Sequence, residues 1–138
     1  MNNVDVIKSL YQAFAAGDID SVRTLLDPSV EWIESDGIPY SGTFKGYEAV
    51  LTGVFAKIGA EWDNFTAHVD QFIDAGDIVV TLGTDSGTYK ATGQNMSAPT
   101  ASIWTLKDGK VIKFRQYIDT LAVVNATQPS EKQDSSSS

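Results

Sequence analysis

The residues best suited to chemistry in this chain begin with the last strand-like segment, residues 111–119. Its side chains alternate with period 2, and the even positions are Ile112, Phe114, Gln116 and Ile118. Successive strand residues point to opposite faces, so the even face is expected to be buried. Gln116 is then an uncharged amide on an apolar face. A buried amide without a partner is costly, so a neighbouring side chain, or water or a ligand in a cavity, must bond to it.

The turn before this segment decides which residues share its buried face. A two-residue turn at residues 108–109 would place Trp104 beside Lys113. A three-residue loop with its glycine in the left-handed conformation would instead pair Thr100, Ser102 and Trp104 with Ile118, Gln116 and Phe114. We favour the three-residue loop, because it keeps Trp104 among apolar partners and Lys113 in water. Ser102 and Gln116 then become neighbours on a concave face.

A candidate proton-transfer group lies on an earlier strand-like segment, where Val30, Trp32 and Glu34 alternate to one face. Glu34 is a candidate general base if apolar surroundings raise its pKa. Ser102 and Gln116 are then candidate catalytic donors to a developing enolate oxygen. The hypothesised reaction is proton abstraction next to a carbonyl, in the isomerisation, cyclisation or dehydration of a small apolar ketone. The alternative is that Glu34 lies in water at the end of its strand.

The candidate ligand-binding residues are mainly aromatic or apolar, and they share the faces described above. They are Trp32, Tyr40, Thr100, Trp104, Phe114 and Ile118. Tyr40 lies within a turn-rich loop and is placed to close the mouth of a cavity. Two alternatives stay open: a packed core or an interface for the aromatic residues, and a hydrogen bond only between themselves for Gln116 and Ser102. His68 shares a polar strand face with Asp70 and is expected in solvent.

Helix signals precede strand signals along the chain. We expect helices bounded by Asn2 or Asn3 and Gly17, by Asp18 and Asp27-Pro28, and by Gly46 and Gly59. Strands are expected over residues 30–34, 62–73, 78–89, 96–106 and 111–119, with a loop over 36–42 and a helical turn over 119–126. Helices followed by a long antiparallel sheet indicate an α+β domain with the helices on one face.

Composition bounds the domain organisation and the class of partner. The chain of 138 residues, 42% hydrophobic and 20% charged, is typical of one globular domain, which we place at residues 1–127. The polar stretch 128–138 is expected to be a disordered tail. A net charge of −8 argues against nucleic acid and membrane surfaces as partners, and the cytoplasm is the default compartment.

The residues that commonly hold metals and reactive cofactors are scarce. The chain has no cysteine and one histidine. The absence of cysteine excludes disulfides, a thiolate nucleophile and Cys-ligated zinc or iron–sulfur sites, and a lone histidine excludes a His-rich metal site. We therefore expect no metal and no cofactor, and a small apolar molecule as ligand or substrate.

A family resemblance is carried by Ala16-Gly17-Asp18 and by residues 104–110 (WTLKDGK) followed by 114–119 (FRQYID). With this order of elements, the chain resembles the SnoaL-like group of the superfamily of nuclear transport factor 2 and ketosteroid isomerase, over residues 4–126. The resemblance implies a cone-shaped fold whose strongly curved, mainly antiparallel sheet encloses an apolar pocket. It also implies a homodimer.

The resemblance does not carry over the acids of the known reactions. The aspartate base of ketosteroid isomerases matches Trp32, their oxyanion-binding tyrosine falls near Leu10, beside Tyr11, and their protonated aspartate matches Ser102. The acid of SnoaL-like cyclases and of limonene-epoxide hydrolases matches Gln116, which cannot abstract a proton. Two function classes remain open: a cofactor-independent isomerase, cyclase or hydratase, and a non-catalytic ligand-binding or dimerisation module.

Overall fold

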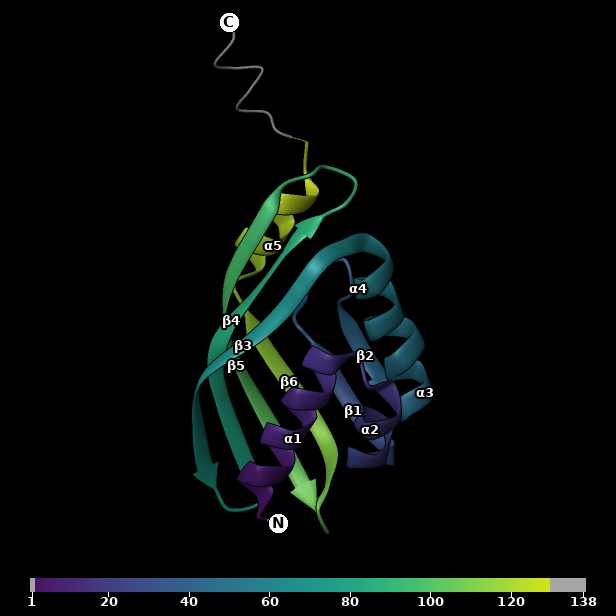
Figure 1. The fold of residues 1–138 in the computed structure, drawn as a ribbon, viewed down its shortest axis with the longest axis vertical. Coiled ribbons are helices and arrows are strands. Elements are labelled where there is room, and N and C mark those ends of the chain that lie inside the picture. The colour runs from purple at the N-terminus through teal and green to yellow at the C-terminus, as the bar shows by residue number, and fades with distance from the viewer. Residues whose placement is uncertain (1, 130–138) are drawn as a thin grey trace, which may run out of the picture.

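The computed structural model describes residues 2–129 as helices packed on a curled sheet (Figure 1). The helical elements are α1 (Asn3–Ala16), α2 (Ile19–Leu25), α3 (Tyr47–Val50), a π-helical turn (Leu51–Phe55), α4 (Ala56–Glu61) and α5 (Thr120–Thr127). The strands are β1 (Leu26–Glu34), β2 (Gly42–Lys45), β3 (Trp62–Ala75), β4 (Ile78–Tyr89), β5 (Asn95–Lys107) and β6 (Lys110–Ile118). Most of the predicted polar tail, residues 130–138, lies outside the described residues.

The sheet has the strand order β2-β1-β6-β5-β4-β3. Strand β1 pairs with β6 in parallel, and the other neighbours are antiparallel. The sheet curls without closing, and the helices lie on its concave side (Figure 1). This arrangement confirms the predicted α+β fold. Within residues 2–129, no helix is long and apolar enough to span a membrane.

The predicted helix starts are confirmed by their caps. The Asn2 side chain accepts a hydrogen bond from the backbone of Asp5, and Asp18 does the same for Ser21. Gly17 ends α1 in the left-handed conformation, with φ of 67°. The predicted stop at Gly59 is wrong, because helix α4 runs on to Glu61. A glycine inside a helix costs only about 1 kcal/mol, which packing can offset.

The turn before β6 differs from the predicted three-residue loop. Asp108 and Gly109 have φ of 52° and 77° and form a two-residue turn between the paired residues Lys107 and Lys110. The register is nevertheless the predicted one, because a bulge places Ile112 as an extra residue opposite the step from Thr105 to Leu106. The resulting pairs are Thr100 with Ile118, Ser102 with Gln116, and Trp104 with Phe114.

Strand β3 is strongly bent, and this bend contributes to the curl of the sheet around its concave side. Its register with β4 shifts twice, between Asp63 and Thr66 and between Val69 and Gln71. At Gly83 of β4, a Cβ atom would lie 1.9 Å from the backbone oxygen of His68. Only glycine allows the two backbones to approach this closely. Strand β2, which the sequence did not predict, extends the other edge of the sheet by pairing with β1.

Candidate functional site

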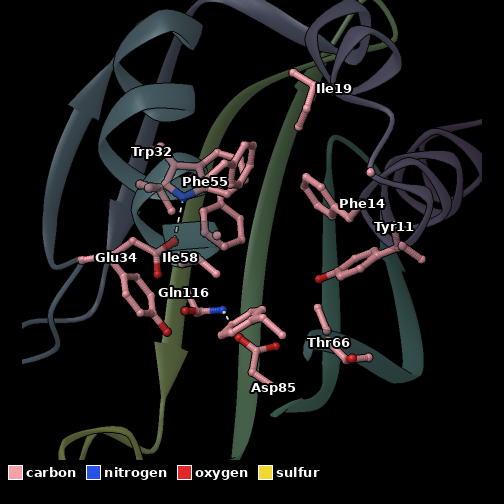
Figure 2. Close-up of a pocket in the computed structure, with 18 of the residues that line it drawn as sticks. Tyr11, Phe14, Ile19, Trp32, Glu34, Phe55, Ile58, Thr66, Asp85 and Gln116 are labelled. Atoms are coloured by element: carbon pink, nitrogen blue, oxygen red, sulfur yellow. Dashed lines mark hydrogen bonds between the residues drawn. The ribbon is translucent and has the colours of Figure 1, made fainter. Parts of the chain in front are cut away.

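A cavity of about 460 Å³ lies between the concave face of the sheet and the elements α1, α4 and the π-helical turn (Figure 2). Its lining comes from every strand except β2. The lining residues are Tyr11, Phe14, Ala15, Gly17, Ile19, Trp32, Glu34, Tyr40, Val54, Phe55, Ile58, Gly59, Phe65, Thr66, Ala67, Asp85, Trp104, Phe114 and Gln116. Of the predicted site residues, Glu34, Gln116, Trp32, Tyr40, Trp104 and Phe114 are in this set.

Aromatic rings form much of the wall and pack against one another. The ring of Trp32 lies 3.9 Å from that of Phe114 and 5.4 Å from that of Phe55, centroid to centroid. Trp104 contacts Phe114 at 4.4 Å, and Phe14 contacts Phe55 at 5.2 Å. Edge-to-face and tilted contacts of this kind hold each ring in place. Aromatic rings in mutual contact therefore form an apolar wall on this side of the cavity.

Glu34, at the end of β1, is buried in this wall with 5% of its surface exposed. The Nε1 atom of Trp32 donates a hydrogen bond to Glu34 Oε2 at 2.7 Å (Figure 2). Glu34 Oε1 is buried and has no hydrogen-bond partner among residues 2–129. Burial raises the pKa of Glu34 to about 8; the Trp32 hydrogen bond opposes this rise and the charge of Asp85 adds to it. The alternative of a glutamate in water is therefore wrong.

Asp85, on β4, supplies a second buried acid that the sequence reasoning missed. It is 6% exposed, and its Oδ2 accepts a hydrogen bond from Gln116 Nε2 at 3.2 Å. Burial raises the pKa of Asp85 to about 7, although the bond from Gln116 lowers it. A signal was present in the sequence, because Asp85 has the same strand parity as Val79 and Thr81, which are both buried.

Gln116 and Ser102 lie opposite each other as predicted, but they have different partners. Gln116 bonds to Asp85 through its amide nitrogen, and its Oε1 is buried without a partner in the described part of the chain. Ser102 is 1% exposed, and its side chain acts on Tyr11 by lowering the pKa of that hydroxyl, against the larger effect of burial. Ser102, Thr100 and Ile118 do not line the cavity. Ile118 instead borders a shallower depression with Arg115 and Tyr117.

Two tyrosines face the cavity from different sides. Tyr40 is 2% exposed, and its hydroxyl has no partner among the described residues. Burial raises the pKa of Tyr40, and the charges of Glu34 and Asp85 raise it further. Tyr11 lies across the cavity from Glu34 (Figure 2), and its hydroxyl is 2.9 Å from Thr81 Oγ1. Burial raises the pKa of Tyr11 to about 12, so both hydroxyls keep their protons at neutral pH.

The two ends of the cavity differ in polarity. Ile19, whose side chain is 42% exposed, lies at the end opposite Asp85 and Gln116 (Figure 2). The exposed residues Gly17 and Gly59 line the cavity with it, which makes this end a mouth. The buried acids therefore lie at the inner end, away from an apolar entrance. Among residues 2–129, no group of three His, Cys, Asp or Glu side chains could hold a metal ion.

The SnoaL-like domain model matches residues 7–114. The chain belongs to the SnoaL-like domain family. An NTF2-like protein from Burkholderia thailandensis E264 is 34% identical, with 94% of this chain and 99% of that one covered and a TM-score of 0.90. This agreement supports the SnoaL-like fold over nearly the whole domain. Among curated proteins, none matches this chain.

Two further solved structures carry more specific names. TerC, co-crystallised with polyporic acid, is 26% identical over 90% of this SnoaL-like chain and 96% of TerC, with a TM-score of 0.82. A putative SnoaL-like polyketide cyclase from Jannaschia sp. CCS1 is 25% identical over 90% of each chain, with a TM-score of 0.79. Each of these two structures is similar to this chain over nearly the whole SnoaL-like domain.

Proposed function

We propose that this SnoaL-like protein is a cofactor-independent enzyme that moves a proton at the carbon next to the carbonyl of a small apolar ketone. The reaction class is isomerisation, cyclisation or dehydration. The observation that carries the proposal is Glu34, a carboxyl group buried in an apolar cavity with Oε1 unpaired in the described chain and its pKa raised to about 8. A group that titrates close to neutral pH is suited both to take and to return a proton.

Asp85 completes the acid–base chemistry. With pKa values of about 8 and 7, Glu34 and Asp85 together hold one proton in the range between them. Asp85, which has the lower pKa, is the ionised carboxylate and removes the proton from the carbon, and the electron pair of the broken C–H bond forms the C=C double bond. Glu34, which has the higher pKa, gives its proton to the carbonyl oxygen, so that an enol results. Asp85 then returns its proton to a different carbon, and Glu34 takes back the proton of the enol oxygen as the carbonyl of the isomerised product re-forms.

Tyr40 takes the oxyanion-binding role that was predicted for Ser102 and Gln116, because Ser102 does not line the cavity and the amide nitrogen of Gln116 donates to Asp85. Its hydroxyl is protonated, buried in the cavity lining and without a partner among the described residues. A buried donor of this kind stabilises a developing enolate more strongly than one in water. Ser102 acts only indirectly, through its effect on the hydroxyl of Tyr11.

The relatives support a small-molecule substrate. TerC was crystallised with polyporic acid, and the Jannaschia protein is named a putative polyketide cyclase. Their names concern compact organic molecules, which fits a cavity of about 460 Å³.

The test uses a readout that does not require the natural substrate. A panel of ring-bearing ketones is incubated with the protein in deuterated water, and exchange at the carbon next to the carbonyl is followed by proton NMR. We expect accelerated exchange for at least one ketone, and a loss of about 10²–10⁴-fold in Glu34→Gln. The control is Glu31→Gln, a partly exposed glutamate on the same strand that pairs with Lys113. Ligand binding without exchange, or full exchange in Glu34→Gln, would favour the non-catalytic alternative.

We also propose that the protein is a homodimer formed through the outer face of the sheet. Cross-strand pairs on that face, Val80 with Ile103 and Leu82 with Ala101, are apolar yet only half-buried. Tyr117, paired with Ala101, is 50% exposed. A second copy covering this face would remove these side chains from water.

A further inference from the structure

We infer that the substrate carries a hydroxyl group beside its carbonyl, on an otherwise apolar, ring-bearing skeleton. The inference rests on the proposed function and specifies the substrate class of the same cavity. An apolar ketone satisfies only part of the site, whereas a hydroxy-ketone satisfies all of it.

Oxygen atoms without hydrogen bonds gather on one part of the cavity wall. They are Glu34 Oε1, Tyr40 Oη and Gln116 Oε1, all buried and all unpaired within residues 2–129. Each such atom costs about 1–3 kcal/mol unless a partner reaches it. Native proteins leave few buried polar atoms unpaired, and those that remain call for an explanation. A ligand that bonds to all of them is one such explanation.

The amide of Gln116 sets the first requirement on that ligand. Its nitrogen donates to Asp85 Oδ2, which fixes the orientation of the amide and turns Oε1 away from the acid. An amide oxygen can only accept a hydrogen bond. The ligand must therefore donate one here, and a ketone without a hydroxyl group has no donor to offer.

Tyr40 and Glu34 set the second requirement. Tyr40 keeps its proton, and Glu34 is mainly protonated at neutral pH, so both can donate. They need an acceptor such as a carbonyl oxygen. The charge of Glu34 acts on the hydroxyl of Tyr40, and Gln116 lies next to Glu34 in the cavity wall (Figure 2). The donor and the acceptor of the ligand must therefore lie at the same end of the molecule, an arrangement that a hydroxyl group beside a carbonyl provides.

The rest of the cavity wall determines the polarity and the orientation of the remaining part of the ligand. Beyond the polar end, the lining is the aromatic cluster of Trp32, Phe55 and Phe14, followed by the exposed Ile19 at the mouth. This surface offers no further unpaired donor or acceptor in the described chain. The ligand is therefore oriented with its oxygens inward and its apolar rings toward the mouth.

A matched pair of ring-bearing probes tests the inference by binding alone. 3-Hydroxyflavone carries a hydroxyl beside its carbonyl, and 3-methoxyflavone keeps the acceptors but lacks the donor. Dissociation constants are measured at neutral pH from the quenching of tryptophan fluorescence, since Trp32 and Trp104 line the cavity. We expect 3-hydroxyflavone to bind at least about tenfold more tightly, the effect of one hydrogen bond to a buried acceptor.

Variants locate the effect. In Gln116→Leu the ratio of the two dissociation constants, 3-methoxyflavone over 3-hydroxyflavone, should fall close to one. In Tyr40→Phe, which removes only an oxygen atom, both probes should weaken by a similar factor and the preference should persist. The matched control is Gln71→Leu, an exposed glutamine on β3 that should leave both affinities unchanged. Because Tyr40→Phe is nearly isosteric, it keeps the test valid if Gln116→Leu does not fold.

Equal affinity for the two probes, failure of both to bind, or an unchanged preference in Gln116→Leu would overturn the inference. None of these readings requires turnover. If Glu34→Gln stops ketone exchange while the two flavones bind equally, the proposed function stands and the hydroxyl requirement falls. If the flavone preference is found and no ketone exchanges, the proposed function falls instead.

Discussion

Glu34 and Asp85 lie on strands that are separated in the sheet by β6 and β5, yet both carboxyl groups line one cavity. The curl of the sheet brings them close enough that the charge of Asp85 raises the pKa of Glu34. Gln116, on the intervening strand β6, donates to Asp85. The charge state of Asp85 therefore contributes to the pKa of Glu34, in addition to the larger effect of burial.

Removing the charge of Asp85 should lower the pKa of Glu34. In Asp85→Asn the contribution of the neighbouring charge is lost, while burial, the largest cause of the shift, remains. We expect the Glu34 midpoint to fall below about 8 yet stay above its ordinary value of 4.5, measured by carbon NMR of glutamate labelled at the side-chain carboxyl. Asp70→Asn, on the exposed face of β3, is the control. An unchanged or higher midpoint would show that the two carboxyls do not interact.

Raising the pH should destabilise the fold. The pKa of Glu34 is higher in the folded protein, about 8, than its ordinary 4.5, so between these values the folded state holds a proton that the unfolded chain releases. The stabilisation is complete below the lower value and is lost as the pH rises through the higher one. Asp85 acts in the same direction, from 3.8 to about 7.

The free energy of unfolding, measured with urea between pH 5 and 9, should therefore decrease with pH, and less steeply in Glu34→Gln. Glu31→Gln should keep the original slope, because Glu31 is partly exposed on the other face of β1. Parallel slopes for the original chain and Glu34→Gln would contradict the burial of a titrating carboxyl group.

Gly83→Ala should destabilise the protein strongly. The added Cβ would lie 1.9 Å from the backbone oxygen of His68, so β3 and β4 would have to separate at the bend. We expect a loss of about 3 kcal/mol or more in denaturant unfolding. Gly59→Ala is the matched control, since nothing lies within 4 Å of its added methyl group and a helical alanine stabilises by about 0.5–1 kcal/mol. Similar stabilities of the two variants would argue against the close approach.

A charge on the outer face of the sheet should break the proposed dimer. In Ile103→Lys a half-buried apolar side chain opposite Val80 becomes cationic. We expect a dimer mass for the unchanged chain and a monomer mass for the variant, by size-exclusion chromatography with light scattering. Thr52→Ala, a change at an exposed residue of the π-helical turn and not of the outer sheet face, should remain dimeric. A monomer mass for the unchanged chain would contradict the proposed dimer.

The features that the sequence predicts well are local. The caps of Asn2 and Asp18 and the left-handed Gly17 depend on neighbouring residues only, and the structure confirms them. The register of β5 with β6 also follows from pattern, because a slip by one residue would turn Trp104 out of the core. A bulge at Ile112 produces this register together with a two-residue turn. The three-residue loop was predicted wrongly because the alternation of side chains does not distinguish a longer turn from a shorter turn followed by a bulge.

The candidate site was predictable only in part. Glu34 could be found because it alternates with Val30 and Trp32 on one apolar face. The signal for Asp85 is weaker: it shares the strand parity of Val79 and Thr81, but Gly83 and Gly87 interrupt the apolar alternation around it. Its role depends on the curl of the sheet, which bulges in β3 produce and which hydrophobic periodicity does not show.

The most direct measurement is the titration of the Glu34 side chain in the unchanged protein, followed by carbon NMR and assigned with Glu34→Gln. Proton transfer by this residue requires a carboxyl group that is shielded from water and changes charge near neutral pH. A midpoint near 8 is the predicted result. A midpoint near the ordinary 4.5 would show a solvated carboxylate and contradict the account.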